Sequence, residues 1–286
     1  EIKILKRILL IGASGFIGRY CYKKIKSNLG DHELTGTFFK NLFPELINLD
    51  YTNLYSLNQV LKTIRPDIII WTAGIKDLSL TEQKNYSLKE QNEIPISEIL
   101  TYQNRINKVT QLVFISSDYV FNGIKGNYET TDDPCPNTNY GKSKYNAEKI
   151  IINNNKLYSI IRAGAVIGRG SKFFEWIKDE LKMNKSIELF DDIFSPTPIN
   201  NIADAIIFSI KNKLKGIYHI SGGKDLSRYE FGMILKKYVP NSNSKLIKLK
   251  NINFSLENQI NRSLVRSKEF DEQESLNEFL KNEFLK

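Results

Sequence analysis

The sequence has few cysteines and histidines and no long hydrophobic run. Its 286 residues include two cysteines and two histidines. Cys21 lies in a predicted helix and Cys135 between prolines, which is neither a disulfide framework nor a metal-ligand spacing. We therefore expect reduced, inert thiols and no metal site. The longest apolar run, around 8–11, is too short to cross a bilayer, and no charged-then-apolar leader precedes it. These absences predict a cytoplasmic protein that does not bind membranes.

The net charge of +9 is spread along the whole chain. The lysines form no basic block and accompany many Asn and Ile residues, as an AT-rich genome would encode. We therefore expect no nucleic-acid partner, although DNA binding that weakens steeply with salt remains a competing hypothesis. A positive field also favours a phosphate-bearing substrate.

The first half alternates short apolar runs with helical periodicity, which predicts βαβ units. Strands are expected at Arg7–Ile11, Glu33–Phe38, Asp67–Thr72, Gln111–Ser116 and Leu157–Arg162. Helices are expected between them at Ile17–Ser27, Tyr55–Ile64, Tyr86–Asn107 and Tyr140–Asn153. This pattern predicts an α/β fold with a doubly wound parallel sheet of the Rossmann type.

After Gly164 the pattern changes. Further elements are expected at Phe173–Asn184, a helix capped by Asn200 or Asn201, Gly216–Ser221, Ser227–Tyr238 and Asp271–Leu285. No linker separates them from the first half. We therefore expect a cofactor-binding domain of 1–164 plus about 196–221, interwoven with a smaller substrate-binding lobe of 165–195 plus 222–286.

The stretch "LLIGASGFIG" places glycines directly after the first strand and at the start of the first helix. Glycines there allow a pyrophosphate to approach the backbone at the positive end of the helix. The Gly-x-x-Gly-x-x-Gly spacing resembles that of the extended short-chain dehydrogenase/reductases. The expected cofactor contacts are Gly12, Ser14, Gly15, Phe16, Ile17 and Gly18.

The end of the second strand lacks the carboxylate that reads the ribose of NAD. Lys40 instead suits a 2′-phosphate, so NADPH is favoured and NADH is the alternative; an ordinary solvated lysine is the other interpretation. Further cofactor contacts are expected after the next apolar stretch and strand, at Asp50, Tyr51, Thr72, Ala73 and Gly74.

"NTNYGKSK" places Tyr140 and Lys144 one helical turn apart on the same face. The lysine charge can lower the tyrosine pKa and make the phenol a usable proton donor or acceptor. Ser116 and Ser117 end a parallel strand at the edge where such sheets bind ligands. We predict Ser117, Tyr140 and Lys144 as catalytic residues, with Ser116, Tyr140 and Lys144 also near the cofactor.

Four segments carry a narrower resemblance: "SSDYVFNG", "NYETTDDPCPNTNYGKSKYNAEKII", "IIRAGAVIGRG" and "SPTPINNIADAI". They resemble the dTDP-4-dehydrorhamnose reductase family, from the glycine loop to about Tyr238. The resemblance implies NAD(P)H-dependent reduction of a nucleotide-linked 4-keto-6-deoxysugar for cell-surface polysaccharide. It assigns Tyr140 as the acid, with Lys144 as its partner and Ser117 in place of the family's Thr/Ser. The implied substrate-binding residues are Asp118, Phe121, Arg169, Phe173 and Phe174.

One segment departs from the family. An Arg-Pro pair usually precedes a Ser-x-Leu-like element, and its arginine meets the substrate phosphates. Here Asn258-Gln259 align with the pair, whereas Ser263 and Leu264 are retained, with Arg262 and Arg266 nearby. Because of this departure, the sequence does not determine the identity of the sugar or of the nucleotide.

Two alternative functions remain at this point. An epimerase or epimerase-reductase would need a further acid/base pair, and no Cys/His pair is suitably placed. The fold also serves as a non-catalytic regulatory subunit, resembling the one that binds methionine adenosyltransferase. By analogy with short-chain reductases, the helices that begin at Tyr86 and Tyr140 predict a homodimer.

Overall fold

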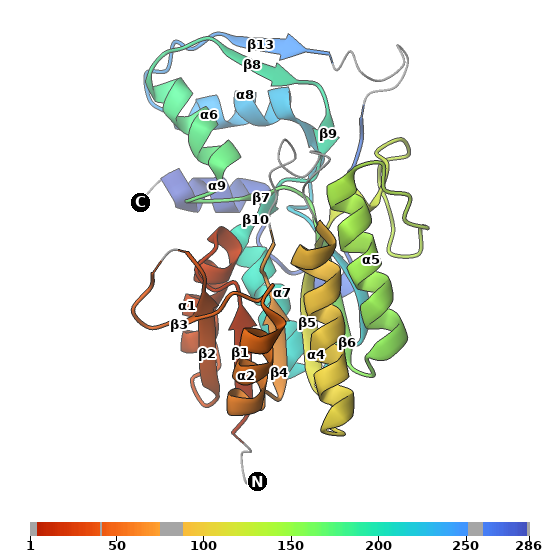
Figure 1. Cartoon of the computed structure of the whole chain (residues 1–286). Coiled ribbons are helices and arrows are strands. Elements are labelled where there is room, and N and C mark those ends of the chain that lie inside the picture. Colours follow the sequence, from red (N-terminus) through yellow and green to blue (C-terminus); the bar gives the residue numbers. More distant parts are fainter. Residues whose placement is uncertain (1–4, 41, 75–87, 251–259, 285–286) are drawn as a thin grey trace. The chain divides into compact units, whose positions relative to one another are not determined.

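The computed structural model describes residues 5–40, 42–74, 88–250 and 260–284, which divide into two compact units (Figure 1). The first comprises 1–120, 134–162 and 203–218, and the second 121–133, 163–202 and 219–286. Segment 121–133, which lies in the cofactor-binding part of the sequence, thus groups with the second unit. The reason is backbone pairing: the Tyr128 N–H donates to the Ser263 carbonyl at 2.8 Å, and the Tyr128 carbonyl accepts from Val265 at 2.9 Å.

A seven-stranded sheet forms the centre of the first unit, in the order β11-β6-β5-β4-β1-β2-β3. This is a common strand order of dinucleotide-binding folds, with an additional edge strand, and the predicted Rossmann sheet is confirmed. The strands are β1 (Arg7–Ile11), β2 (Glu33–Phe38), β3 (Ile47–Asn48), β4 (Ile68–Trp71), β5 (Gln111–Ser117), β6 (Tyr158–Ala163) and β11 (Gly216–Ile220). The order places the ends of β1 and β4 side by side, with Ile11 opposite Trp71.

Helices cover the sheet, with α2, α4 and α5 packed together on one face (Figure 1). Because central strands are buried on both faces, they read as continuous apolar runs, and all of β4 and β5 is buried. The helices are α1 (Phe16–Asn28), α2 (Leu54–Ile64), the π-helical turn η1 (Lys89–Glu93), α4 (Ile94–Arg105), the 3₁₀ turn η2 (Asp118–Val120), α5 (Asn139–Asn154) and α7 (Ile199–Lys211).

The second unit packs helices against short strand pairs. Its helices are α6 (Lys172–Lys182), α8 (Arg228–Tyr238), the 3₁₀ turn η3 (Lys268–Phe270) and α9 (Leu276–Phe284). Its strands are β7 (Val166–Ile167) paired with β10 (Thr197–Pro198), β8 (Ile187–Phe190) with β13 (Leu246–Leu249), and β9 (Ile193–Phe194) with β12 (Leu226–Ser227). Two-residue strands carry no periodic pattern, so the sequence did not reveal most of them.

The predicted cap of α7 is wrong. Asn200 and Asn201 lie inside the first turn, because the helix begins at Ile199. Their side-chain amides donate instead to Glu274, at 2.6 Å to its carboxylate and 2.9 Å to its carbonyl. The two asparagines therefore tie α7 to the C-terminal segment.

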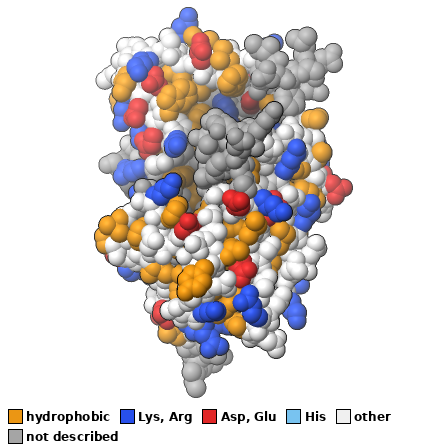
Figure 2. All heavy atoms as spheres, in the orientation of Figure 1, with side chains coloured by type: hydrophobic (Ala, Val, Ile, Leu, Met, Phe, Trp, Pro, Cys, Tyr) orange, Lys and Arg blue, Asp and Glu red, His pale blue; other side chains and the backbone are white. Residues whose placement is uncertain are grey.

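Surface charge is mixed on the face shown in Figure 2, where lysines and arginines are distributed with acidic side chains between them. Within the described ranges, no helix is both long and apolar enough to cross a membrane. The same ranges hold no group of three or more His, Cys, Asp or Glu side chains arranged to bind a metal.

Candidate active site

The glycine loop between β1 and α1 leaves no room for a side chain at Gly12 or Gly18. Gly12 has a φ of +89°, and a Cβ there would lie 2.7 Å from the backbone nitrogen of Ala73. A Cβ on Gly18 would lie 2.0 Å from the Gly12 carbonyl oxygen. Only glycine therefore lets the loop pack on the end of β4 while α1 begins directly behind it.

Thr37 at the end of β2 fixes this loop. The Gly12 N–H donates to the Thr37 Oγ1 at 3.1 Å, and the Ser14 N–H to its carbonyl at 3.3 Å. No acidic residue occupies the first turn of α1, so the positive end of the helix is available to an anion. This cradle fits the pyrophosphate of a dinucleotide. Sequence analysis missed Thr37, although it precedes the expected ribose-reading position.

Two predicted cofactor residues follow β2 and β3. Lys40 is exposed, with its Nζ 5.7 Å from the centroid of the Phe39 ring. Asp50 Oδ1 accepts from the Thr52 N–H at 3.0 Å and from the Thr52 hydroxyl at 2.6 Å. The Asp50 carboxylate is therefore oriented by its own turn, whereas Lys40 extends into solvent.

The other predicted cofactor residues surround the end of β4. The Thr72 hydroxyl donates to the Ile11 carbonyl at 3.0 Å, which joins the ends of β4 and β1. The Tyr51 hydroxyl donates to Gln91 at 2.8 Å. Gly74 follows in a left-handed conformation, with a φ of +137°.

Local packing at the start of α5 positions Tyr140. Thr138 caps the helix by accepting the Gly141 N–H at 3.0 Å. A Cβ on Gly141 would lie 2.0 Å from the Tyr119 carbonyl, so the glycine lets this turn pack directly on η2. The Tyr140 ring then meets the Tyr119 ring edge-on at 5.7 Å. The "NYG" sequence thus brings Tyr140 to the end of β5.

Ser117, Asp118 and Tyr140 form a buried polar group. The Ser117 hydroxyl donates to Asp118 Oδ1 at 2.8 Å. Burial raises the pKa of Tyr140, the Asp118 charge raises it further, and a hydrogen bond with Ser117 lowers it less. Lys144, which we expected to lower this pKa, is not among the groups that shift it; burial and Asp118 raise it. Tyr140 keeps its proton at neutral pH, as a proton donor must.

Lys144 lies one turn further along α5 and is buried. Its Nζ donates to the Ile115 carbonyl at 3.1 Å and lies 4.8 Å from the centroid of the Phe114 ring. A Cβ on Gly74 would be 3.5 Å from this Nζ. The ammonium group is thus held at the adjacent ends of β4 and β5, beside the predicted cofactor residue Gly74.

Asn92, in the π-helical turn η1, joins this group and was missed from the sequence. Its Nδ2 donates to the Ser143 hydroxyl at 3.0 Å, which donates to the Leu88 carbonyl at 3.1 Å. Its buried Oδ1 has no hydrogen-bond partner among the described residues, and a Cβ on Gly74 would lie 3.5 Å from it. Such π-turns are frequent at functional sites.

A buried ion pair lies behind the candidate catalytic residues. Glu148, one turn beyond Lys144, binds Arg162 of β6, with 2.7 Å between Oε2 and Nη2. The Ser116 hydroxyl donates to Glu148 Oε1 at 2.5 Å. Both charged side chains are almost completely buried. The carboxylate thus connects α5 to β5 and β6, and its position on the face of Tyr140 and Lys144 was a readable signal.

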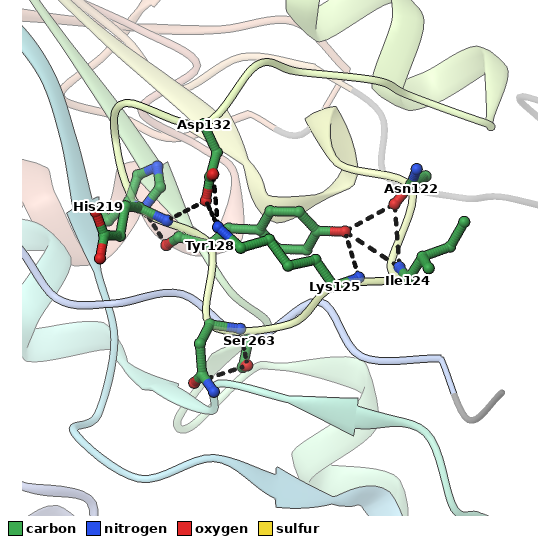
Figure 3. Close-up of polar contacts among 9 residues, drawn as sticks. Asn122, Ile124, Lys125, Tyr128, Asp132, His219 and Ser263 are labelled. Atoms are coloured by element: carbon green, nitrogen blue, oxygen red, sulfur yellow. Dashed lines mark hydrogen bonds and ion pairs between the residues drawn. The ribbon is translucent and has the colours of Figure 1, made fainter.

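The predicted substrate residue Phe121 begins loop 121–133 of the second unit. Figure 3 shows the polar contacts of this loop. Its ring stacks on Tyr128 with centroids 4.1 Å apart. The Tyr128 hydroxyl donates to Asn122 Oδ1 at 2.7 Å and accepts the N–H groups of Ile124 and Lys125. The loop therefore presents Phe121 on a fixed support.

The buried His219 supports the same loop from behind (Figure 3). Its Nδ1 lies 3.0 Å from the Tyr128 carbonyl. Asp132 forms an ion pair with Lys125 at 2.6 Å, and this bond, the Glu129 N–H and the charge of His219 lower the Asp132 pKa. These contacts further anchor the loop that carries Phe121.

The three predicted residues near α6 occupy different surroundings. Arg169 is exposed, with its Nε 3.5 Å from Glu283. Phe174 is fully buried and packs in the core, 6.0 Å from the Phe284 ring. Phe173 lies in an aromatic cluster with Phe194, Phe231 and Trp176. Cationic side chains lie over two of these rings: Lys178 Nζ is 5.6 Å from the Phe174 centroid, and Arg228 Cζ is 5.0 Å from that of Phe173.

The segment that departs from the expected family pattern is only partly described. Asn258 and Gln259 lie outside the described residues. Arg262 donates to the Phe121 and Asn122 carbonyls, and Arg266 to the Ser221 carbonyl at 2.5 and 2.9 Å. Both arginines bind backbone oxygens of the second unit.

Comparison with known proteins gives one family match and several relatives. The RmlD substrate binding domain matches residues 6–264. The chain is 25% identical over 237 residues to methionine adenosyltransferase 2 subunit beta of Xenopus tropicalis, covering 79% of this chain and 70% of that protein. It is 30% identical over 230 residues to the spore coat polysaccharide biosynthesis protein SpsK of Bacillus subtilis, covering 79% and 77%.

A solved structure is similar over nearly the whole chain. It is a dTDP-4-dehydrorhamnose reductase from Bacillus anthracis in complex with NADP, with 26% identity and a TM-score of 0.84. The similarity covers 98% of this chain and 99% of that one. The shared architecture therefore includes both units.

Proposed function

The chain belongs to the family of the RmlD substrate binding domain, and on this basis we propose that it reduces the 4-keto group of a nucleotide-linked deoxysugar. The observation that carries the proposal is the buried group of Ser117, Asp118 and Tyr140 at the end of β5, with Lys144 one helical turn further along α5. A nicotinamide nucleotide, when bound in the glycine cradle, would supply the hydride. The B. anthracis relative, a reductase in complex with NADP, supports this reading.

Ser117, Tyr140 and Lys144 each have a separate role in the reaction. Ser117 turns its hydroxyl from Asp118 to the substrate carbonyl, donates a hydrogen bond to it and polarises it. Tyr140 gives its proton to the developing alkoxide, because its raised pKa keeps the phenol protonated until charge develops nearby. Lys144, fixed by the Ile115 carbonyl, places a positive charge beside Gly74, where it orients the cofactor and favours the phenolate left on Tyr140.

The test is turnover of purified protein with reduced nicotinamide nucleotides and a panel of nucleotide 4-keto-sugars, followed by nicotinamide absorbance. We expect Tyr140→Phe to reduce kcat by roughly 10²–10⁴-fold, the usual contribution of a general acid. Tyr145→Phe is the matched control, since Tyr145 lies on the same helix and is partly exposed. Turnover that survives Tyr140→Phe would contradict the assigned role.

We further propose a preference for NADPH, supported by the exposed Lys40 and the absence of a carboxylate at the end of β2. Lys40→Ala should weaken NADPH binding and leave NADH binding unchanged, because only NADPH carries the 2′-phosphate. Titration of both nucleotides by fluorescence measures this difference. Equal losses for both would contradict the assignment.

A regulatory subunit is the second candidate, favoured by the similarity to methionine adenosyltransferase 2 subunit beta. It predicts cofactor binding without turnover on any keto-sugar, and capture of a catalytic partner in a pull-down. Tyr140-dependent turnover would contradict it.

A further inference from the structure

Arg228, the first residue of α8, has its guanidinium group in the corner formed by two aromatic rings of the second unit, which meet edge-on with centroids 6.1 Å apart. Its Cζ lies 5.0 Å from the centroid of Phe173 and 5.2 Å from that of Phe194. Phe231 supports both rings, at 5.9 and 5.7 Å. Cation–π contacts with two adjoining rings therefore restrict the orientation of the guanidinium of this partly buried residue.

The N–H groups of this guanidinium have no oxygen acceptor in the described part of the chain. Its contacts there are the two ring faces, whereas the Arg228 backbone N–H donates to the Asp192 carbonyl at 3.2 Å. By contrast, Arg262 and Arg266 donate to backbone carbonyls, and Arg169 faces Glu283. Arg228 thus combines a fixed orientation with unused donors.

Neighbouring carboxylates are engaged elsewhere. Asp191 forms an ion pair with Lys248 at 2.8 Å. The Glu230 carboxylate accepts the Ser227 N–H at 2.7 Å in the capping box of α8. No ion pair to Arg228 occurs among the described residues, so its charge is available to an external oxyanion. An oriented guanidinium binds a phosphate through parallel N–H···O bonds.

We propose that Arg228, held against Phe173 and Phe194, binds a phosphate group of the nucleoside diphosphate in the substrate. The inference deepens the proposed function and rests on it. Arg228 would supply the cation that the family resemblance expects near Asn258-Gln259, where this sequence has no arginine. A diphosphate carries the charge and the oxygen geometry that match a fixed guanidinium.

Calorimetric titration with dTDP, UDP, GDP and inorganic pyrophosphate tests the site. Wild type should bind at least one nucleoside diphosphate, and Arg228→Met should weaken that binding by roughly 10–100-fold, as for a lost charge-assisted pair. Arg228→Lys should restore only part of the affinity, because an ammonium group lacks the planar fork. Arg105→Met is the matched control and should bind as wild type, because Arg105 is an exposed residue of α4 in the first unit. Thermal unfolding and NADPH binding confirm that each variant is folded.

Three results would overturn the site: no diphosphate binding by wild type, unchanged binding by Arg228→Met, or an equal loss in Arg105→Met. Other results distinguish a failure of the phosphate site from a failure of the proposed reductase function. Tyr140-dependent turnover with an unchanged KM in Arg228→Met would retain the reductase and refute the site. Diphosphate binding that requires Arg228, without turnover of any keto-sugar, would support the site and refute the reductase.

Discussion

Removing the carboxylate of Glu148 should destabilise the first unit more than any exposed ion-pair change. Glu148→Leu leaves the Arg162 guanidinium in the core, where 2% of its side chain is exposed, and removes the acceptor of Ser116. Breaking a buried pair by removing one partner costs about 3–5 kcal/mol, because the remaining charge is desolvated without compensation. At about 2–4 °C per kcal/mol, Tm should fall by roughly 6–20 °C.

The double variant separates charge from packing. Glu148→Leu with Arg162→Met removes both charges, and such replacements are often neutral or stabilising. We therefore expect it to recover most of the loss. Glu148→Gln should cost less than Glu148→Leu, because the amide still accepts from Ser116. Glu45→Leu is the exposed control; Glu45 and its partner Lys26 have 58% and 61% of their side chains exposed, so the loss should be small.

Urea unfolding followed by tryptophan fluorescence measures these differences, because Trp71 is fully buried in the first unit. A loss below about 1 kcal/mol for Glu148→Leu, or a double variant no more stable than the single one, would refute the argument from buried charge. Activity gives a second readout. Since Glu148 connects Ser116 to the helix of Lys144, the recovered double variant should show reduced kcat with unchanged cofactor affinity.

Three further predictions follow from the backbone and pKa findings. Gly12→Ala should lose at least about 1 kcal/mol of stability and most cofactor affinity, since its φ is positive; normal NADPH titration and melting would contradict this. A thiol reagent should modify the exposed Cys135 in the native protein and Cys21 only after unfolding, because burial raises the Cys21 pKa to about 12. Rapid modification of both cysteines in the folded protein would contradict this prediction. In the pH profile of kcat/KM, Asp118→Asn should move the alkaline limb to lower pH, because the Asp118 charge helps raise the Tyr140 pKa; an unmoved limb would refute that cause.

Local sequence patterns were sufficient to predict most helices and strands of the first unit. The predicted bounds of β1 and β2 agree with the structure. The helices α1 and α5 extend one residue further at each end than predicted, and α2 begins one residue earlier. The signals for these elements extend over a few residues: alternation of apolar runs, a capping threonine, and a glycine loop between strand and helix. The Asn200 and Asn201 cap failed because a distant residue, Glu274, binds both amides.

The sequence by itself determined the Rossmann sheet, the glycine cradle and the shared helix face of Tyr140 and Lys144, because each depends on spacing within one or two elements. Only the tertiary structure decided which groups meet across the chain: Glu148 with Arg162, and Arg228 with its aromatic rings. It also decided the direction of the Tyr140 pKa shift, since burial and the Asp118 charge depend on packing. Contacts between distant segments and desolvation have no local pattern, so the folded chain alone reveals them.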